Sequence, residues 1–172
     1  MSIGRSASSP SPKGKLTKEQ ALQKLRHFCR YQDRCHYDVT QKLWSLKVPP
    51  YMHSEILSTL IEEGDVNEER YTKSFVRGKF NLNDWGRNKI KQGLHEKRIS
   101  PYVLKEALKE INEKDYLHKL EQLARKKYNL LKHDQYLVRK KKTIDYLLSK
   151  GYEPQLVMKV VEGMDKGGKA RD

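Results

Sequence analysis

Four residues near the start of the chain are of the two types, histidine and cysteine, that most often bind zinc in proteins. They are His27, Cys29, Cys35 and His36, and they form the pattern H-x-C-x5-C-H. The two cysteines are too far apart for the C-x2–4-C spacing of a zinc knuckle, and Cys29 falls on the apolar face of a helical pattern. Two cysteines are also too few for a disulfide framework. We therefore expect free thiols, no metal ion and no other cofactor.

The other reactive side chains form no catalytic pattern. The six histidines are scattered along the chain, and none stands in a triad or in a metal-ligand spacing. The sequence has no glycine-rich phosphate loop, no H-E-x-x-H and no nucleophile elbow. We therefore expect that the protein is not an enzyme.

Positive charge is the strongest chemical signal. The chain has 36 lysines and arginines against 22 acidic residues, a net charge of +14. A basic surface attracts nucleic acid or an acidic protein groove and speeds encounter with either. Such charge also serves solubility alone.

Two clusters of cations are candidates for binding. At 100° per helical residue, Arg87, Lys91 and Arg98 fall within about 40° of one another, and we expect all three to be exposed. Residues 125–142 hold eight lysines or arginines against the single acidic residue Asp134. Recurrence of basic runs in neighbouring segments favours a binding role over a plain solvated face. The candidate binding residues are Arg77, Arg87, Lys91, Arg98, Arg125, Lys126, Lys127, Arg139, Lys140, Lys141 and Lys142.

The apolar pattern predicts which way the second cluster faces. Leu137, Ile144 and Leu148 share one side of a helix, which we expect to face the core. Arg139 and Lys142 point away from that side and should be solvated.

Three prolines expose an internal repeat that must position these clusters. Pro50, Pro101 and Pro154 lie 51 and 53 residues apart, and apolar residues align around each of them. The aligned columns are Leu43/Leu94/Leu147, Val48/Ile99/Tyr152, Met52/Val103/Leu156, Ile56/Ala107/Val160, Leu57/Leu108/Val161 and Leu60/Ile111/Met164. The last four columns follow i, i+4, i+5, i+8, the spacing of an amphipathic helix.

Each repeat is predicted to contain three helices. The predicted ranges are 17–31, 36–47, 50–63, 67–81, 84–97, 101–112, 114–130, 134–149 and 154–163. The predicted N-caps are Thr17, Asn67, Asp84, Ser100 and Asp134. In the helix 84–97, Gly86 and Gly93 predict close approach of a neighbouring helix. The fold class is therefore all-α, with three tandem three-helix repeats forming an elongated, curved molecule.

The expected domain limits follow from this period. The repeats occupy residues 16–64, 65–113 and 114–164, between a disordered basic tail, 1–15, and a flexible tail, 165–172. The sequence has no apolar run long enough for a membrane span and no secretory signal core, so we expect a cytoplasmic protein without a membrane partner. We expect it to be a monomer.

One string in the middle repeat resembles a known family. Residues 64–77 read GDVNEERYTKSFVR, and residues 85–94 read WGRNKIKQGL, followed by Ile99. This resembles the central motif of the RecX family, in which an acidic turn leads into R-Y-A-x-x-F-V, and a glycine and an arginine precede I-x-x-x-L-x-x-K-G-I. The resemblance covers about residues 17–163. Thr72 replaces the usual alanine, and Arg98 replaces the glycine of K-G-I.

The resemblance implies a regulator of the RecA recombinase in DNA repair, homologous recombination and the SOS response. Such a protein would bind the RecA–single-stranded DNA filament and inhibit its recombinase, ATPase and coprotease activities. One alternative is a sequence-nonspecific DNA-binding repeat protein, with weak binding to single- or double-stranded DNA. A purely structural helical adaptor would leave the charge without a use.

Overall fold

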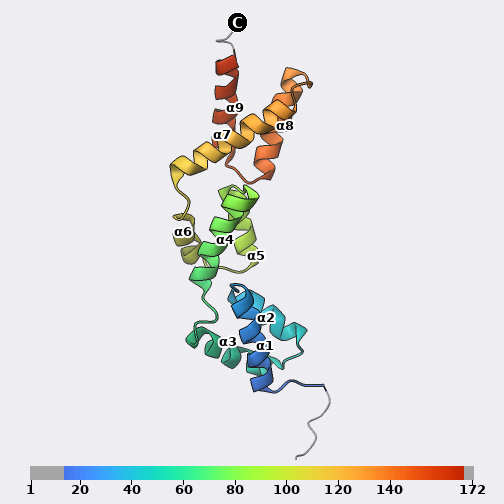
Figure 1. The fold of residues 1–172 in the computed structure, drawn as a ribbon, viewed down its shortest axis with the longest axis vertical. Helices are drawn as coiled ribbons and strands as arrows, with labels where there is room; N and C mark the ends of the chain where they lie inside the picture. Colours follow the sequence, from blue (N-terminus) through green and yellow to red (C-terminus); the bar gives the residue numbers. More distant parts are fainter. Residues whose placement is uncertain (1–13, 169–172) are drawn as a thin grey trace, which may run out of the picture. The chain divides into compact units, whose positions relative to one another are not determined.

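The computed structural model describes residues 14–168, with side chains up to residue 164. Over this range it contains nine α-helices, one 3-10 turn and no strand, so the all-α fold class and the three-helix repeats are confirmed (Figure 1). The predicted tails lie largely outside the described residues. No helix in the described range is long and apolar enough to cross a lipid bilayer.

The helices follow the predicted order. The first repeat contains α1 (Lys18–Tyr31), α2 (His36–Ser45) and α3 (His53–Glu62), and α3 is preceded by the 3-10 turn η1 (Pro50–Met52). The second contains α4 (Glu68–Asn83), α5 (Arg87–Glu96) and α6 (Pro101–Leu108). The third contains α7 (Glu113–Leu130), α8 (Tyr136–Ser149) and α9 (Pro154–Gly168), and α9 runs past its predicted end at 163.

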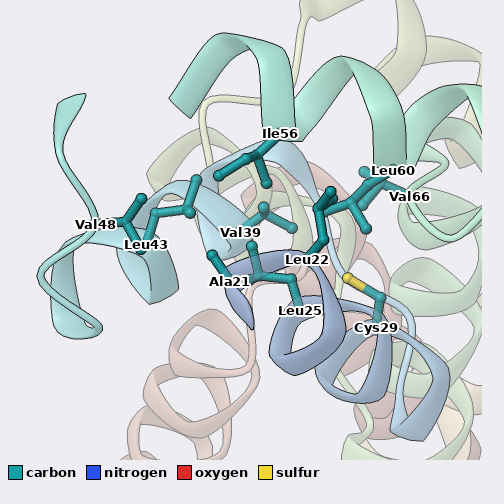
Figure 2. Packing of buried hydrophobic residues seen from close by; sticks show 10 residues of the cluster. All are labelled: Ala21, Leu22, Leu25, Cys29, Val39, Leu43, Val48, Ile56, Leu60 and Val66. Carbon is teal, nitrogen blue, oxygen red and sulfur yellow. The ribbon is translucent and has the colours of Figure 1, made fainter. Parts of the chain in front are cut away.

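The chain divides between Val66 and Asn67 into two compact units. The first repeat forms one unit, and the second and third repeats together form the other. In the first unit, apolar side chains from α1, α2 and α3 point toward one another, and Cys29 lies among them (Figure 2). Cys29 is 4% exposed, in agreement with its predicted place on an apolar face.

The three middle helices end in the same turn. One residue in each turn has a left-handed backbone, and the N–H of the next residue donates to a carbonyl five positions earlier. The left-handed residues are Lys47, Arg98 and Gly151, with φ of 55°, 57° and 91°. The hydrogen bonds run from Val48 to Leu43, from Ile99 to Leu94 and from Tyr152 to Leu147, over 3.1, 3.1 and 3.3 Å. This is a Schellman-type helix end, and it joins two of the aligned columns in every repeat.

Three of the five predicted N-caps are confirmed. Thr17 forms a capping box with Gln20, and Asn67 and Ser100 each accept a hydrogen bond from a backbone N–H of the first helical turn.

The N-caps predicted at Asp84 and Asp134 are wrong. Asp84 instead ends α4 with φ of 58°, and α8 begins after Gln135. Both carboxylates are ion-paired, Asp84 with Lys119 at 3.0 Å and Asp134 with Lys142 at 2.9 Å.

Candidate functional site

The second and third repeats meet through two glycines. The N–H of Gly86 donates to the carbonyl of Lys150 over 2.8 Å, and the N–H of Asn88 donates to the carbonyl of Gly151 over 2.9 Å. A Cβ on Gly86 would collide with the main chain of Gly151, and a Cβ on Gly151 would collide with Lys89. The predicted close approach at Gly86 is therefore present, but its partner is the turn before α9 and not a helix.

Gly93 permits a second close contact, this time with a helix. A Cβ at this position would lie 3.0 Å from the ring of Phe75, which belongs to α4. Gly86, directly before α5, therefore packs against a turn, and Gly93, within α5, packs against an aromatic ring.

A closed network of polar contacts surrounds Arg87. The backbone N–H of Arg87 donates to the hydroxyl of Tyr116 over 3.0 Å, and this hydroxyl donates to Glu153 over 2.5 Å. The guanidinium of Arg87 lies 3.9 Å from the centre of the Tyr116 ring and donates to Glu153 over 3.4 Å and to Glu113 over 2.5 Å. We call Gly86, Arg87, Tyr116, Gly151 and Glu153 the repeat junction.

Burial changes the acid–base properties of the repeat junction. Burial, followed by the hydrogen bond to Glu153, raises the pKa of the Tyr116 phenol far above its ordinary value. Burial opposes the charge of Arg87, but the hydrogen bond to Glu113 and the charges of Glu113 and Glu153 outweigh it, so the pKa of Arg87 is raised. Both groups keep their neutral-pH protonation state, as a permanent structural contact requires.

Arg87 is therefore not the exposed cation that the sequence suggested. Its side chain is 19% exposed and bonded on three sides. The predicted face shared with Lys91 and Arg98 is also wrong, because α5 ends at Glu96 and Arg98 lies in the left-handed turn that follows. Arg77, on α4, is exposed and ion-paired with Glu110 at 3.4 Å.

Most candidate cations of α7 and α8 also have intramolecular partners. Arg139 lies 3.5 Å from the centre of the Tyr128 ring and donates to the Tyr128 carbonyl over 2.6 Å. It is half-buried, so its predicted full solvation is wrong. Lys127 lies 5.1 Å from the centre of the Tyr146 ring, within the range of a cation–π contact.

The following lysines of α8 are exposed or half-buried. Lys141 pairs with Asp145 at 2.7 Å, and Lys142 pairs with Asp134 at 2.9 Å, both on the surface. Lys140 is half-buried. Surface pairs of this kind contribute little to stability and leave the lysines accessible to a partner.

Three candidates are exposed and have no hydrogen bond, ion pair or ring contact with another described residue. They are Lys91, Arg125 and Lys126. We call these three residues the open cations. Since no intramolecular partner neutralises them, they are the candidate charges with most to gain from an acidic partner.

The apolar face of α8 is the part of the site that sequence reasoning misplaced. Leu137, expected to face the core, is 74% exposed, and Leu148 is 38% exposed. The buried residues of α8 are instead Thr143 and Leu147. The helix α8 has 14 residues against 10 in α2 and α5, so Leu137 lies in a first turn that the shorter helices lack. Leu148 lies at the other end of α8, beside the buried Leu147.

The described residues contain no group of three or more histidine, cysteine or acidic side chains that could hold a metal ion. Cys29 and Cys35 are both buried and are not joined in a disulfide. The candidate site is therefore a surface of charged and apolar side chains, of the kind that binds a partner.

Comparison with protein families gives two matches along the second unit. The model of the second three-helix domain of RecX matches residues 67–108, and that of the third three-helix domain of RecX matches residues 113–161. These are the second and third repeats described above.

Individual proteins agree with the family models. A regulatory protein RecX of Oceanobacillus iheyensis is 27% identical over 81% of this chain and 51% of its own length. One from Clostridium beijerinckii is 34% identical over 68% of this chain and 56% of its own. The crystal structure of RecX from Lactobacillus salivarius superposes with a TM-score of 0.76 at 29% identity, covering 86% of this chain and 96% of that one. The chain spans about half the length of the first curated relatives it matches.

Proposed function

The chain belongs to the RecX family, and we propose that it binds the filament of RecA recombinase on single-stranded DNA and lowers the recombinase, ATPase and coprotease activities of that filament. The relatives that support this proposal carry the name regulatory protein RecX. Binding of RecA is what the resemblance of residues 64–99 implies.

One observation carries the proposal beyond the family name. The open cations Lys91, Arg125 and Lys126 all lie in the second unit, on helices that the repeat junction or direct packing joins together. Because the backbone that carries these charges belongs to packed helices, only their side chains lose conformational freedom when they meet a partner. A nucleoprotein filament offers acidic protein side chains and phosphates to such a surface, and the net charge of +14 accelerates the encounter.

The proposal is tested by comparing two ligands at matched salt. Full-length protein is mixed with RecA filaments on single-stranded DNA, or with the same DNA alone, and binding is measured by co-sedimentation or fluorescence anisotropy. We expect saturable binding to the filament and weak binding to bare DNA near physiological salt.

A different outcome favours direct DNA binding. Phosphate contacts release counterions, so affinity for bare DNA would fall steeply as salt rises. Equal affinity for bare DNA and for the filament, with the same salt dependence, would replace the RecA regulator by a sequence-nonspecific DNA-binding protein.

A further inference from the structure

The helix ends that flank the turn between α7 and α8 carry four exposed apolar side chains. Leu130 is 71% exposed, Tyr136 51%, Leu137 74% and Val138 43%. They fall within nine consecutive residues, at the free end of the α7–α8 hairpin, drawn in orange in Figure 1. We call these four residues the hairpin tip. Single exposed leucines are common on protein surfaces, whereas several exposed apolar residues at one place are a candidate contact surface.

The hairpin tip rests on an ordered support. The Tyr128 carbonyl accepts hydrogen bonds from Arg139 over 2.6 Å and from the N–H of Leu131 over 3.3 Å, so it ties the end of α7 to the start of α8. The ion pair of Asp134 with Lys142 fastens the turn to the next part of α8. The apolar side chains are thus presented by a braced hairpin, which lowers the entropy cost of docking.

Positive charge surrounds the hairpin tip. Lys126 and Lys132 are exposed before and within the turn, and Lys141 is exposed one helical turn after Leu137. The single carboxylate in residues 125–142, that of Asp134, is already paired with Lys142. The residues around the hairpin tip therefore carry a strong excess of positive charge.

We propose that the hairpin tip inserts its leucines into an apolar pocket on an acidic protein surface, with the surrounding lysines pairing with carboxylates at the rim. The inference rests on the proposed function, in which this protein surface belongs to the protein component of the filament. Lysines alone suffice to bind phosphates, and of the four residues of the hairpin tip only Tyr136 has a π-face to stack on bases. Exposed aliphatic side chains gain chiefly by leaving water, and an apolar protein pocket provides that burial.

The test removes the apolar groups and keeps the charges. The double variant Leu130→Ser/Leu137→Ser is compared with Leu82→Ser, which changes a leucine that is 85% exposed in the same unit but far from the turn in sequence. A second variant, Leu137→Met, retains an apolar side chain of similar size. Affinity is measured for RecA filaments and for bare single-stranded DNA, and thermal melting reports on folding.

We expect the double variant to bind filaments at least tenfold more weakly than wild type, with unchanged melting and unchanged binding to bare DNA. Leu82→Ser and Leu137→Met should bind filaments like wild type. A double variant that binds filaments as tightly as wild type would overturn the docking proposal alone. Equal losses on filaments and bare DNA would assign the hairpin tip to nucleic acid. A wild type that does not bind filaments would overturn the proposed function, and the docking proposal with it.

Discussion

The hydroxyl of Tyr116, on α7, donates a hydrogen bond over 2.5 Å to Glu153, which directly precedes α9 and lies 37 residues later in the sequence. The ring of Tyr116 stacks on Phe80 at 5.8 Å and contacts Tyr152 at 5.1 Å between ring centres. Tyr116 is therefore packed on its faces and bonded at its hydroxyl. Because Phe80 belongs to the second repeat and Tyr116 to the third, the two repeats should unfold together.

The two neighbouring tyrosines allow a matched comparison of stability. Tyr152 is as buried as Tyr116, but its hydroxyl has no hydrogen-bond partner among the described residues. We expect Tyr116→Phe to lower the free energy of unfolding by about 1–3 kcal/mol, because the Arg87 N–H and the Glu153 carboxylate lose a partner. Tyr152→Phe should lie within about 0.5 kcal/mol of wild type or be slightly more stable. Urea denaturation measures both, and equal losses would contradict this account of the repeat junction.

The same residues predict alkaline instability. Burial raises the folded-state pKa of Tyr116 and of Tyr152 above the ordinary value of 10.0. Since the unfolded chain then releases these protons more readily than the folded protein, their contribution to stability is complete below pH 10 and is lost as pH rises beyond it. Titration of tyrosinate absorbance should show these two of the ten tyrosines ionising only as the protein unfolds. In Tyr116→Phe one late-ionising group should disappear; ionisation of all tyrosines before any loss of helicity would exclude the predicted burial.

The glycine contact is tested by a pair of alanine substitutions. Gly86→Ala should destabilise the protein by about 1–3 kcal/mol, because the new methyl group meets the Gly151 main chain and the repeats must separate. Gly78→Ala is the control: Gly78 lies inside α4 with nothing within 4 Å of a Cβ, so alanine should stabilise by up to about 1 kcal/mol. Thermal melting distinguishes the two directions. A neutral Gly86→Ala would mean that the two turns do not pack closely in solution.

The repeated left-handed turn predicts a stabilising substitution. Lys47 is exposed and has φ of 55°, a conformation that costs a non-glycine residue energy. Lys47→Gly should raise the free energy of unfolding by about 0.5–1 kcal/mol, whereas Lys47→Ala, which removes the same side chain and keeps the Cβ, should not. Denaturant titration of both variants decides the matter, and equal effects would show that the side chain and not the backbone is responsible.

The repeat register was predictable because it depends on local chemistry. All three repeats share the same local features. The middle helix ends in a left-handed turn, closed by a hydrogen bond between two apolar residues five positions apart, and a proline begins the helical segment that follows. The family pattern also has glycine where this chain has Arg98, and the left-handed φ of 57° gives the physical reason for that preference.

The roles of individual cations were not predictable because they depend on partners distant in sequence. Arg87 is bonded to Glu113 and Glu153, which lie 26 and 66 residues away in the sequence. A helical wheel compares only residues of one helix, so it cannot predict these contacts. Asp84 was misassigned for the same reason, since Lys119 recruits it 35 residues later. Leu137 has the spacing of an apolar helix face. Whether such a face is buried, however, depends on how far the neighbouring helices extend alongside it.

The central claim is most directly tested by RecA ATP hydrolysis on single-stranded DNA as the protein is added. Wild type should lower the rate saturably. The open-cation variant Lys91→Glu/Arg125→Glu/Lys126→Glu should need more than tenfold higher concentration, about 1.4 kcal/mol of binding energy, for the same effect. The control Lys24→Glu/Lys47→Glu/Lys114→Glu changes net charge equally at other exposed lysines and should behave much like wild type. An ATPase rate that does not respond to wild type, or that responds equally to both triple variants, would contradict the account.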